Sequence, residues 1–237
     1  MEIESQVALI TGASTGIGQA TAAALAREGC QVILSSRSED KLHEVATEID
    51  DVGGKSTVLP FDLQVDSNIT SVVETIDEEF GQLDILVNNA GVGDWQFDDI
   101  DNTTIRTVNE VNLVGLQQLT FAALPLLRES GSGHIVNVSS LSGRGASGGS
   151  PMYSAAKAGV NTFSESLTRR LRTDPIRVTL VEPGTVDTPM QPEEERGADW
   201  MLQPEDIADA VIYAISRPRT VSVYNISVIP SCRPDDE

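Results

Sequence analysis

Two polar side chains in the second half of the chain have the spacing and the chemistry needed for proton transfer. Tyr153 and Lys157 are four residues apart, so on a helix they share one face and their polar ends can reach the same ligand. A free tyrosine has a pKa of about 10, which is too high for efficient acid–base work near neutral pH, and a nearby ammonium group lowers it. Lys157 is therefore interpreted as the activator of Tyr153. The alternative is a solvated surface helix, where such a pair is common.

A glycine-rich turn near the start of the chain could hold a phosphate. Residues 11–18 read Thr-Gly-Ala-Ser-Thr-Gly-Ile-Gly and lead from an apolar run into a helical pattern. Glycines let the turn tighten and let a pyrophosphate approach the backbone, where the helix N-terminus attracts its charge. The spacing G-x-x-x-G-x-G differs from the G-x-G-x-x-G fingerprint, so a purely structural turn is the alternative. Its place between a strand and a helix favours a dinucleotide site.

The elements that must position these residues follow from the hydrophobic pattern. Short apolar runs alternate with longer segments of helical periodicity, which is typical of βαβ units that form a parallel sheet. Strands are predicted at residues 6–10, 31–35, 56–61, 83–87, 134–138, 178–181 and 223–229. Helices are predicted at residues 16–28, 38–51, 67–80, 103–130, 151–173 and 204–216. The 237 residues are interpreted as one α/β domain, doubly wound, with about seven parallel strands and helices on both faces.

Four motifs occur in the order found in one enzyme family. The turn at residues 11–18 is similar to the glycine motif of the short-chain dehydrogenases/reductases, and residues 88–91 (Asn-Asn-Ala-Gly) resemble the motif that ends the family's fourth strand. Residues 153–157 match Y-x-x-x-K, with Ser140 thirteen residues upstream, and residues 183–188 resemble P-G-x-x-x-T. The chain is identified as a member of this family from about residue 7 to residue 188, which implies a Rossmann-type fold.

The resemblance implies an oxidoreductase that interconverts a carbonyl compound and an alcohol. The cofactor transfers the hydride, and Tyr153 gives a proton to the carbonyl oxygen in reduction and takes it back in oxidation. Lys157 also binds the nicotinamide ribose, Ser140 orients and polarises the carbonyl, and Asn112 extends a proton relay through water. Ser139 is the alternative to Ser140, and a packing role is the alternative for Asn112. Besides Tyr153 and Lys157, the residues expected at the cofactor are Gly12, Ser14, Thr15, Gly16, Ile17, Gly18, Ser36, Arg37, Asp62, Leu63, Asn89, Ala90, Gly91, Pro183, Gly184, Val186 and Thr188.

The choice between the two nicotinamide cofactors depends on the end of the second predicted strand. An acidic residue there binds the ribose 2′-OH of NAD, but this chain has Ser36 at that position, followed by Arg37. A guanidinium can form a charge-assisted pair with a 2′-phosphate. NADP(H) is therefore predicted as the preferred cofactor. NAD(H) is the alternative, in which Arg37 stacks on the adenine or faces solvent.

The substrate is constrained only by loops that the family varies. Asp94, Trp95, Arg144 and Met190 are expected to border the pocket. A short lid is expected near residues 188–201, which favours a small or open-sited carbonyl substrate. Arg144 can grip a substrate carboxylate with two hydrogen bonds, with a solvated surface arginine as the alternative. Residues 202–230 resemble the branch that acts on 3-oxo acids, 3-hydroxy acids and serine-like compounds. That branch is usually tetrameric, so a homotetramer or homodimer is expected.

The net charge is far from ordinary. Thirty-six acidic residues against 16 basic ones, only three of them lysine, give a net charge of −20. Such a surface repels nucleic acids and anionic membranes, so neither is expected as a partner. The composition predicts an enzyme from a halophilic, haloarchaeal-like organism with molar salt in its cytoplasm. The alternative is an acidic coat that serves solubility alone.

The remaining composition restricts location and function class. No apolar run approaches the roughly 20 residues of a membrane helix, and the first residues do not resemble a signal peptide, so a soluble, cytoplasmic protein is expected. Cys30 and Cys232 are far apart, and no cluster with metal-ligand spacing occurs, so neither a disulfide framework nor a metal site is expected. The alternative function is a non-catalytic NADP(H)-binding sensor or scaffold of the same fold. Such proteins commonly lose the tyrosine or the lysine, and this chain keeps both.

Overall fold

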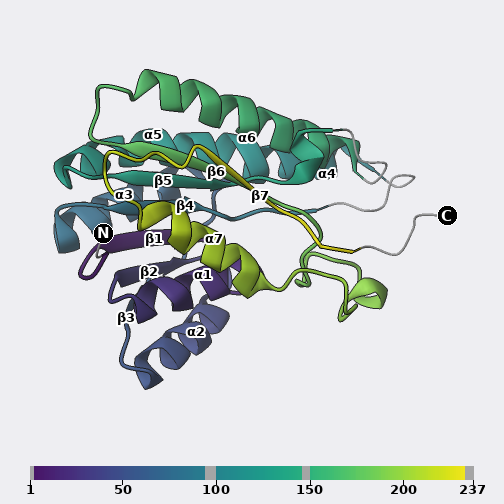
Figure 1. Ribbon diagram of the computed structural model, residues 1–237, viewed down its shortest axis with the longest axis horizontal. Helices are drawn as coiled ribbons and strands as arrows, with labels where there is room; N and C mark the ends of the chain where they lie inside the picture. Colours follow the sequence, from purple (N-terminus) through teal and green to yellow (C-terminus); the bar gives the residue numbers. More distant parts are fainter. Residues whose placement is uncertain (1–2, 94–99, 146–149, 233–237) are drawn as a thin grey trace.

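A parallel sheet of seven strands forms the centre of the computed structural model, which describes residues 3–93, 100–145 and 150–232 (Figure 1). Continuous runs of apolar residues build most of the strands, and five of the seven are buried throughout or nearly so, as expected for a sheet covered on both faces. The strands are β1 (Val7–Thr11), β2 (Gln31–Ser35), β3 (Lys55–Val58), β4 (Ile85–Asn88), β5 (His134–Val138), β6 (Arg177–Pro183) and β7 (Asn225–Val228).

The strand order β3-β2-β1-β4-β5-β6-β7 places a change of direction at the middle of the sheet. From β1 the chain first builds outward through β2 and β3, then returns to lay β4 on the other side of β1. The crossovers on the two sides run in opposite directions, so a crevice opens at the carboxyl ends of β1 and β4. Ligands of open α/β sheets bind at such a point.

Helices cover both faces of the sheet, which confirms the predicted doubly wound architecture (Figure 1). One face carries α1 (Gly16–Arg27), α2 (Glu39–Asp51) and α7 (Pro204–Ile215). The other carries α3 (Asp66–Phe80), α5 (Gly115–Glu129) and α6 (Pro151–Arg170), with α4 (Asn102–Asn109) beside α6. Each group of helices buries its own hydrophobic cluster against the strands.

One predicted element is wrong in its continuity. The sequence pattern predicts a single helix over residues 103–130, whereas the structure has α4, a π-helical segment η2 (Glu110–Val114) and α5 in succession. No proline or glycine lies within η2, so the sequence gives no local signal that the α-helix is interrupted there. Short π-helical segments inside longer helices are frequent at functional sites, and this one contains Asn112.

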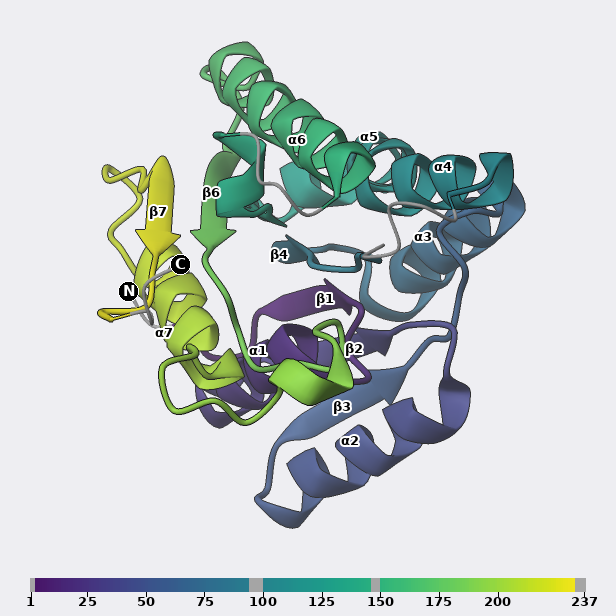
Figure 2. The same cartoon turned by 90° about the vertical axis from the view of Figure 1, so that its right-hand side faces the viewer.

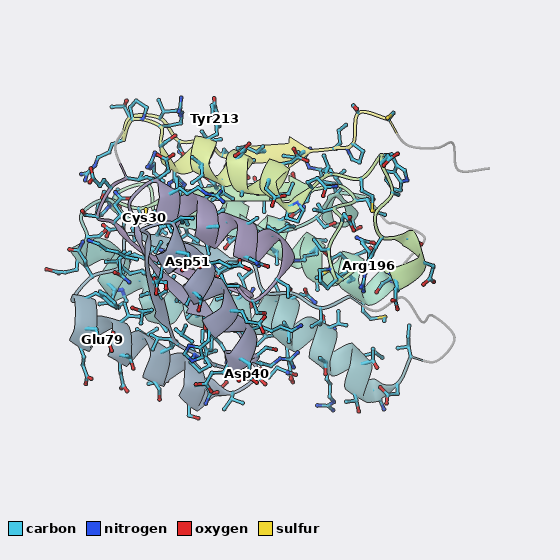
Figure 3. All side chains as sticks on the ribbon, turned by 90° about the horizontal axis from the view of Figure 1, so that it is seen from below. Cys30, Asp40, Asp51, Glu79, Arg196 and Tyr213 are labelled. Atoms are coloured by element: carbon cyan, nitrogen blue, oxygen red, sulfur yellow. The ribbon has the colours of Figure 1, made fainter. Side chains whose placement is uncertain are left out.

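The acidic side chains of α2 and α3 form an exposed coat on one part of the molecule. Asp40 and Asp51 on α2 and Glu79 on α3 are all exposed, and Figure 3 shows where they lie among the side chains of this side of the molecule. Among the residues described, no helix is long and apolar enough to cross a membrane. The same part of the chain has no group of three His, Cys, Asp or Glu side chains able to hold a metal ion.

Candidate active site

A cleft of about 1040 Å³ lies at the carboxyl ends of the central strands, at the upper end of the range for small-molecule sites. Residues that follow β1, β2, β4, β5 and β6 line it together. Figure 2 looks onto this end of the sheet, with the light green segment that contains η4 (Glu193–Glu195) crossing in front of β1. The crevice expected from the strand order is therefore the place where the predicted site residues meet.

The glycine turn after β1 is shaped for close approach of backbone. A Cβ on Gly18 would lie 2.2 Å from the carbonyl oxygen of Gly12 and 2.5 Å from Nδ2 of Asn89, so no other residue fits without displacing the turn. The Asn89 side chain donates to the carbonyl oxygen of Thr11 at 2.9 Å, which ties the turn to the end of β4. Helix α1 begins at Gly16 with no acidic residue in its first turn and no side-chain cap. Its first backbone N–H groups are suited to an anion.

The ends of β2 and β3 supply the residues expected near a ribose. Ser36 and the exposed Arg37 follow β2 and line the cleft, and Ser36 Oγ accepts a hydrogen bond from the Ser38 backbone at 3.1 Å. Asp62 and Leu63 line the same cleft, and Oδ1 of Asp62 accepts from the Gln64 backbone at 3.0 Å. A guanidinium rather than a carboxylate thus follows β2, and this donor set fits a phosphate better than a ribose hydroxyl.

Tyr153 lies in the first turn of α6, where the sequence places a cap. Ser150 accepts a hydrogen bond from the Tyr153 backbone at 3.2 Å, and Pro151 occupies the first helical position. Burial raises the pKa of the Tyr153 hydroxyl, and a side-chain hydrogen bond with Ser140 acts in the opposite direction. The expected lowering of this pKa is outweighed by burial, and the hydrogen bond with Ser140 counteracts part of the rise.

Lys157 is an ammonium group inside the protein. The residue is 3 % exposed, its Nζ lies 5.6 Å from the centre of the Tyr153 ring, and it donates to the carbonyl oxygen of Val138 at 2.9 Å. Burial lowers its pKa to about 8. At neutral pH the group is therefore still mostly protonated, and it supplies a positive charge at the floor of the cleft.

Asn112 is fully buried and does not line the cleft, but it holds a segment that does. Its Nδ2 donates to the carbonyl oxygen of Val92 at 2.9 Å, and its Oδ1 accepts from the Val92 backbone at 3.2 Å. A Cβ on Gly91 would lie 2.8 Å from this Oδ1 and 3.7 Å from Nζ of Lys157. The asparagine, the glycine and the lysine are therefore close together, and the π-helical turn presents Asn112 to the loop after β4.

The two candidate serines have different surroundings. Ser139 is buried and its hydroxyl donates to Oδ1 of Asn161 at 2.6 Å. Ser140 is partly exposed, lines the cleft and hydrogen-bonds Tyr153. This geometry favours Ser140 for contact with a substrate and gives Ser139 a structural role.

Arg144 lies away from the position expected for substrate recognition. Its Nε donates to Oε2 of the buried Glu182 at 2.6 Å, and a second nitrogen reaches Oδ1 of Asn225 at 2.6 Å. Arg144 is also absent from the residues that line the cleft. The guanidinium already holds a carboxylate of the protein itself, so the structure replaces the expected substrate grip with an internal ion pair.

The segment expected as a lid lies over the cleft. Thr188, Met190 and Trp200 line it, and a Cβ on Gly16 would lie 3.0 Å from the Thr188 side chain, at the start of α1. Arg196 donates to the carbonyl oxygens of residues 189 and 191, both at 2.9 Å, and so folds this segment onto itself (Figure 3).

The structure brings most of the expected site residues to the cleft. Asp94 and Trp95 lie outside the described residues, and Gly18 acts by packing below the turn. Sequence reasoning missed Glu182, although an acidic residue near the end of an apolar strand is a signal for a buried, paired carboxylate. The expected residues that line the cleft are Gly12, Ser14, Thr15, Gly16, Ile17, Ser36, Arg37, Asp62, Leu63, Asn89, Ala90, Gly91, Ser140, Tyr153, Lys157, Pro183, Gly184, Val186, Thr188 and Met190.

Comparison with known proteins decides the family of this site. Residues 6–199 match the family described as short chain dehydrogenase. The chain belongs to the short-chain dehydrogenase family. An uncharacterized oxidoreductase of Staphylococcus saprophyticus is 38 % identical over 234 residues, which cover 97 % of this chain and 99 % of the relative. The chain is thus an oxidoreductase of this family. The comparisons support neither the expected 3-hydroxy acid branch nor the expected halophilic origin.

Two solved structures of similar proteins have the same fold over nearly all of the chain. A metagenomic short-chain oxidoreductase in complex with NADP has a TM-score of 0.86 and 31 % identity, covering 98 % of this chain and 100 % of its own. L-Sorbose reductase from Gluconobacter frateurii, complexed with NADPH and L-sorbose, has a TM-score of 0.88 and 27 % identity, covering 97 % and 98 %. Both similar enzymes were therefore captured with the phosphorylated nicotinamide cofactor.

Proposed function

We propose that this short-chain dehydrogenase is an NADP(H)-dependent oxidoreductase that interconverts a carbonyl compound and an alcohol, with Tyr153 as the general acid and base. The observation that carries the proposal is the meeting of Ser140, Tyr153 and Lys157 at one cleft with the glycine turn after β1. NADP(H) supplies or accepts the hydride when bound. The turn and the start of α1 would hold its pyrophosphate, and Arg37 would hold its 2′-phosphate.

The side chains of the cleft have separate tasks in the proposed reduction. The Tyr153 hydroxyl donates its proton to the carbonyl oxygen, because burial keeps it protonated at neutral pH. The Ser140 hydroxyl orients the same oxygen and stabilises the negative charge that develops on the tyrosine. Lys157 lowers the energy of the tyrosinate through its positive charge, which is buried 5.6 Å from the centre of the Tyr153 ring, where electrostatic effects are stronger than in water. In oxidation the tyrosinate takes the proton back.

The finer features of the proposal have separate support. Two observations support NADP(H) over NAD(H): the similar enzymes named above were solved with NADP or NADPH, and Ser36 and Arg37 follow β2 in this chain. A homotetramer or homodimer is proposed, since Phe121 on α5 and Tyr213 on α7 are large side chains that are 59 % and 53 % exposed. We further propose that the chain forms one domain with a lid at residues 188–201. The proposed location is the cytoplasm, and the proposed substrate is a small carbonyl compound. A 3-oxo acid stays one substrate candidate among others.

The decisive experiment records NADPH consumption with a panel of aldehydes, ketones, 3-oxo acids and sugars. We expect turnover with at least one class of carbonyl compound. Tyr153→Phe should lower kcat at least about 100-fold, which is the smallest usual contribution of general acid–base catalysis, while NADPH affinity stays within about twofold. NADPH binding without turnover on any compound would instead indicate a sensor or scaffold. A Tyr153→Phe enzyme that keeps more than about a tenth of the rate would refute the role of the tyrosine.

A further inference from the structure

Glu182 is a buried carboxylate beside the site that no step of the proposed chemistry uses. It precedes the last residue of β6, and its side chain is 1 % exposed. A carboxylate in such a place is unfavourable unless it is paired and hydrogen-bonded. Four side chains donate to it: Asn161 Nδ2 at 2.9 Å, Arg144 Nε at 2.6 Å, Asn225 Nδ2 at 2.5 Å and Ser227 Oγ at 3.3 Å.

The donors come from three elements that surround the catalytic residues. Arg144 follows the short helix η3 (Leu141–Gly143), which itself follows Ser140. Asn161 is one turn after Lys157 on α6, so it lies on the helix face that carries Tyr153 and Lys157. The other two donors belong to β7. Glu182 therefore joins the serine loop and the helix of the tyrosine through one carboxylate group.

The loop that Arg144 anchors determines the position of Ser140. Its Oγ accepts a hydrogen bond from the Ser142 backbone at 3.1 Å, and its carbonyl oxygen accepts from the Gly143 backbone at 3.0 Å. A Cβ on Gly143 would lie 2.8 Å from the carbonyl oxygen of Lys157, so η3 packs directly on the backbone of α6. On the other side of Ser140, Ser139 is bonded to Asn161, which is itself bonded to Glu182.

We propose that Glu182 and Arg144 form a clamp that positions Ser140 against Tyr153, which makes both of them positioning residues for the reaction proposed above. The clamp rests on that proposed function for its catalytic meaning, whereas its geometry stands without it. Half of the Arg144 side chain is exposed, so its removal should disturb the conformation of the loop and leave the hydrophobic core intact. The carboxylate keeps three other donors in that case.

Loss of the clamp has effects that a general loss of stability does not have. When η3 loosens, Ser140 no longer holds its hydrogen bond with Tyr153, and kcat falls. The glycine turn follows β1 and belongs to another part of the sheet than the loop after β5, so it keeps its affinity for NADPH. The same bond opposes the rise in the pKa of Tyr153 that burial causes. Its loss therefore moves the pH profile of alcohol oxidation, which needs the tyrosinate, to higher pH. The charged group that faces the tyrosine, Lys157 on α6, stays in place.

The test compares Arg144→Ala and Arg144→Lys with Arg169→Ala as the matched control. Arg169 also pairs with a glutamate, but on the exposed face of α6. For Arg144→Ala we expect a fall in kcat of about tenfold or more, an alkaline shift of the oxidation profile and an NADPH Kd within about twofold of wild type. Arg144→Lys should recover part of the rate, and Arg169→Ala should match wild type. Glu182→Gln, which keeps the shape and removes the charge, should resemble Arg144→Ala.

Amide hydrogen exchange separates the clamp from the proposed activity. The backbone N–H groups of Ser142 and Gly143 should exchange at least about tenfold faster in Arg144→Ala than in wild type, measured without substrate. Unchanged exchange and unchanged kcat would overturn the clamp, as would equal losses of rate and NADPH affinity. If wild type reduces no compound of the panel, the proposed function fails, and the exchange of these two amides still decides whether the clamp exists.

Discussion

Replacement of Lys157 by methionine should stabilise the protein at neutral pH while it abolishes catalysis. Lys157 is buried, and burial lowers its pKa from 10.5 to about 8, so keeping it charged in the folded protein at pH 7 disfavours folding by about 3 kcal/mol. Methionine has a similar length and no charge. It also removes the hydrogen bond to the carbonyl oxygen of Val138, which costs about 1 kcal/mol. The expected net gain in the free energy of unfolding at pH 7 is about 2 kcal/mol.

The pH dependence of this gain separates the charge from the packing. The folded-state pKa of Lys157 lies below the unfolded-state value, so the unfolded chain binds more protons between pH 8 and 10.5, and the penalty disappears as the pH rises through this range. At pH 9.5 about 1 kcal/mol of the penalty remains. The advantage of the Lys157→Met variant over wild type should therefore shrink by about 2 kcal/mol between pH 7 and pH 9.5.

The assay is urea unfolding of the nucleotide-free protein, followed by circular dichroism at several pH values. Lys41→Met, at an exposed position of α2, is the control for loss of a lysine and should follow wild type at each pH. The difference between two variants cancels the other groups that titrate in this range. An advantage of Lys157→Met that does not change with pH, or a variant less stable than wild type by more at pH 7 than at pH 9.5, would refute the reasoning.

Three further outcomes are expected. The double change Ser36→Asp and Arg37→Ile should move the ratio of kcat/KM from NADPH toward NADH, because a carboxylate accepts the 2′-OH and repels the phosphate; an unchanged ratio would place the 2′ site elsewhere. Gly18→Ala should weaken NADPH binding in calorimetry at least about tenfold, since its Cβ would lie 2.2 Å from the Gly12 carbonyl oxygen, whereas Gly145→Ala, with no atom within 4 Å, should bind normally. With a net charge of −20, the thermal midpoint should rise steadily with KCl up to several molar, and a flat curve would favour the acidic coat that serves solubility.

The strands were predictable because their signal is local. The first two strands are built on runs of buried aliphatic residues, and their bounds differ from the predicted ones by one residue at most. The helix predicted over residues 103–130 shows a feature that local sequence signals do not predict, namely its interruption by η2. The π-turn holds Asn112, which bonds to Val92, twenty residues earlier. That contact exists only after the chain has folded.

The candidate site divides in the same manner. The spacing of Tyr153 and Lys157 follows from one helix, and the structure places both in the cleft as their spacing suggests. The partner of Arg144 is Glu182, which lies 38 residues later on another element. Residue spacing within one segment therefore could not predict this ion pair. The pKa of Tyr153 was likewise misjudged, because a sequence shows the neighbouring lysine but not the burial that dominates.

The π-helical segment has a consequence for how this protein can change in evolution. A π-turn holds one residue more than an α-turn, and each residue advances an α-helix by about 100°. Deletion of one residue within Glu110–Val114 would make the helix regular, and because the wide turn already absorbs the extra residue, α5 would keep its orientation against α4. The buried leucines of α5 would stay in the core, but the widened turn that presents Asn112 to Val92 would be lost. A lineage could therefore shorten this helix and keep the fold, but only by giving up the contact that holds the loop after β4.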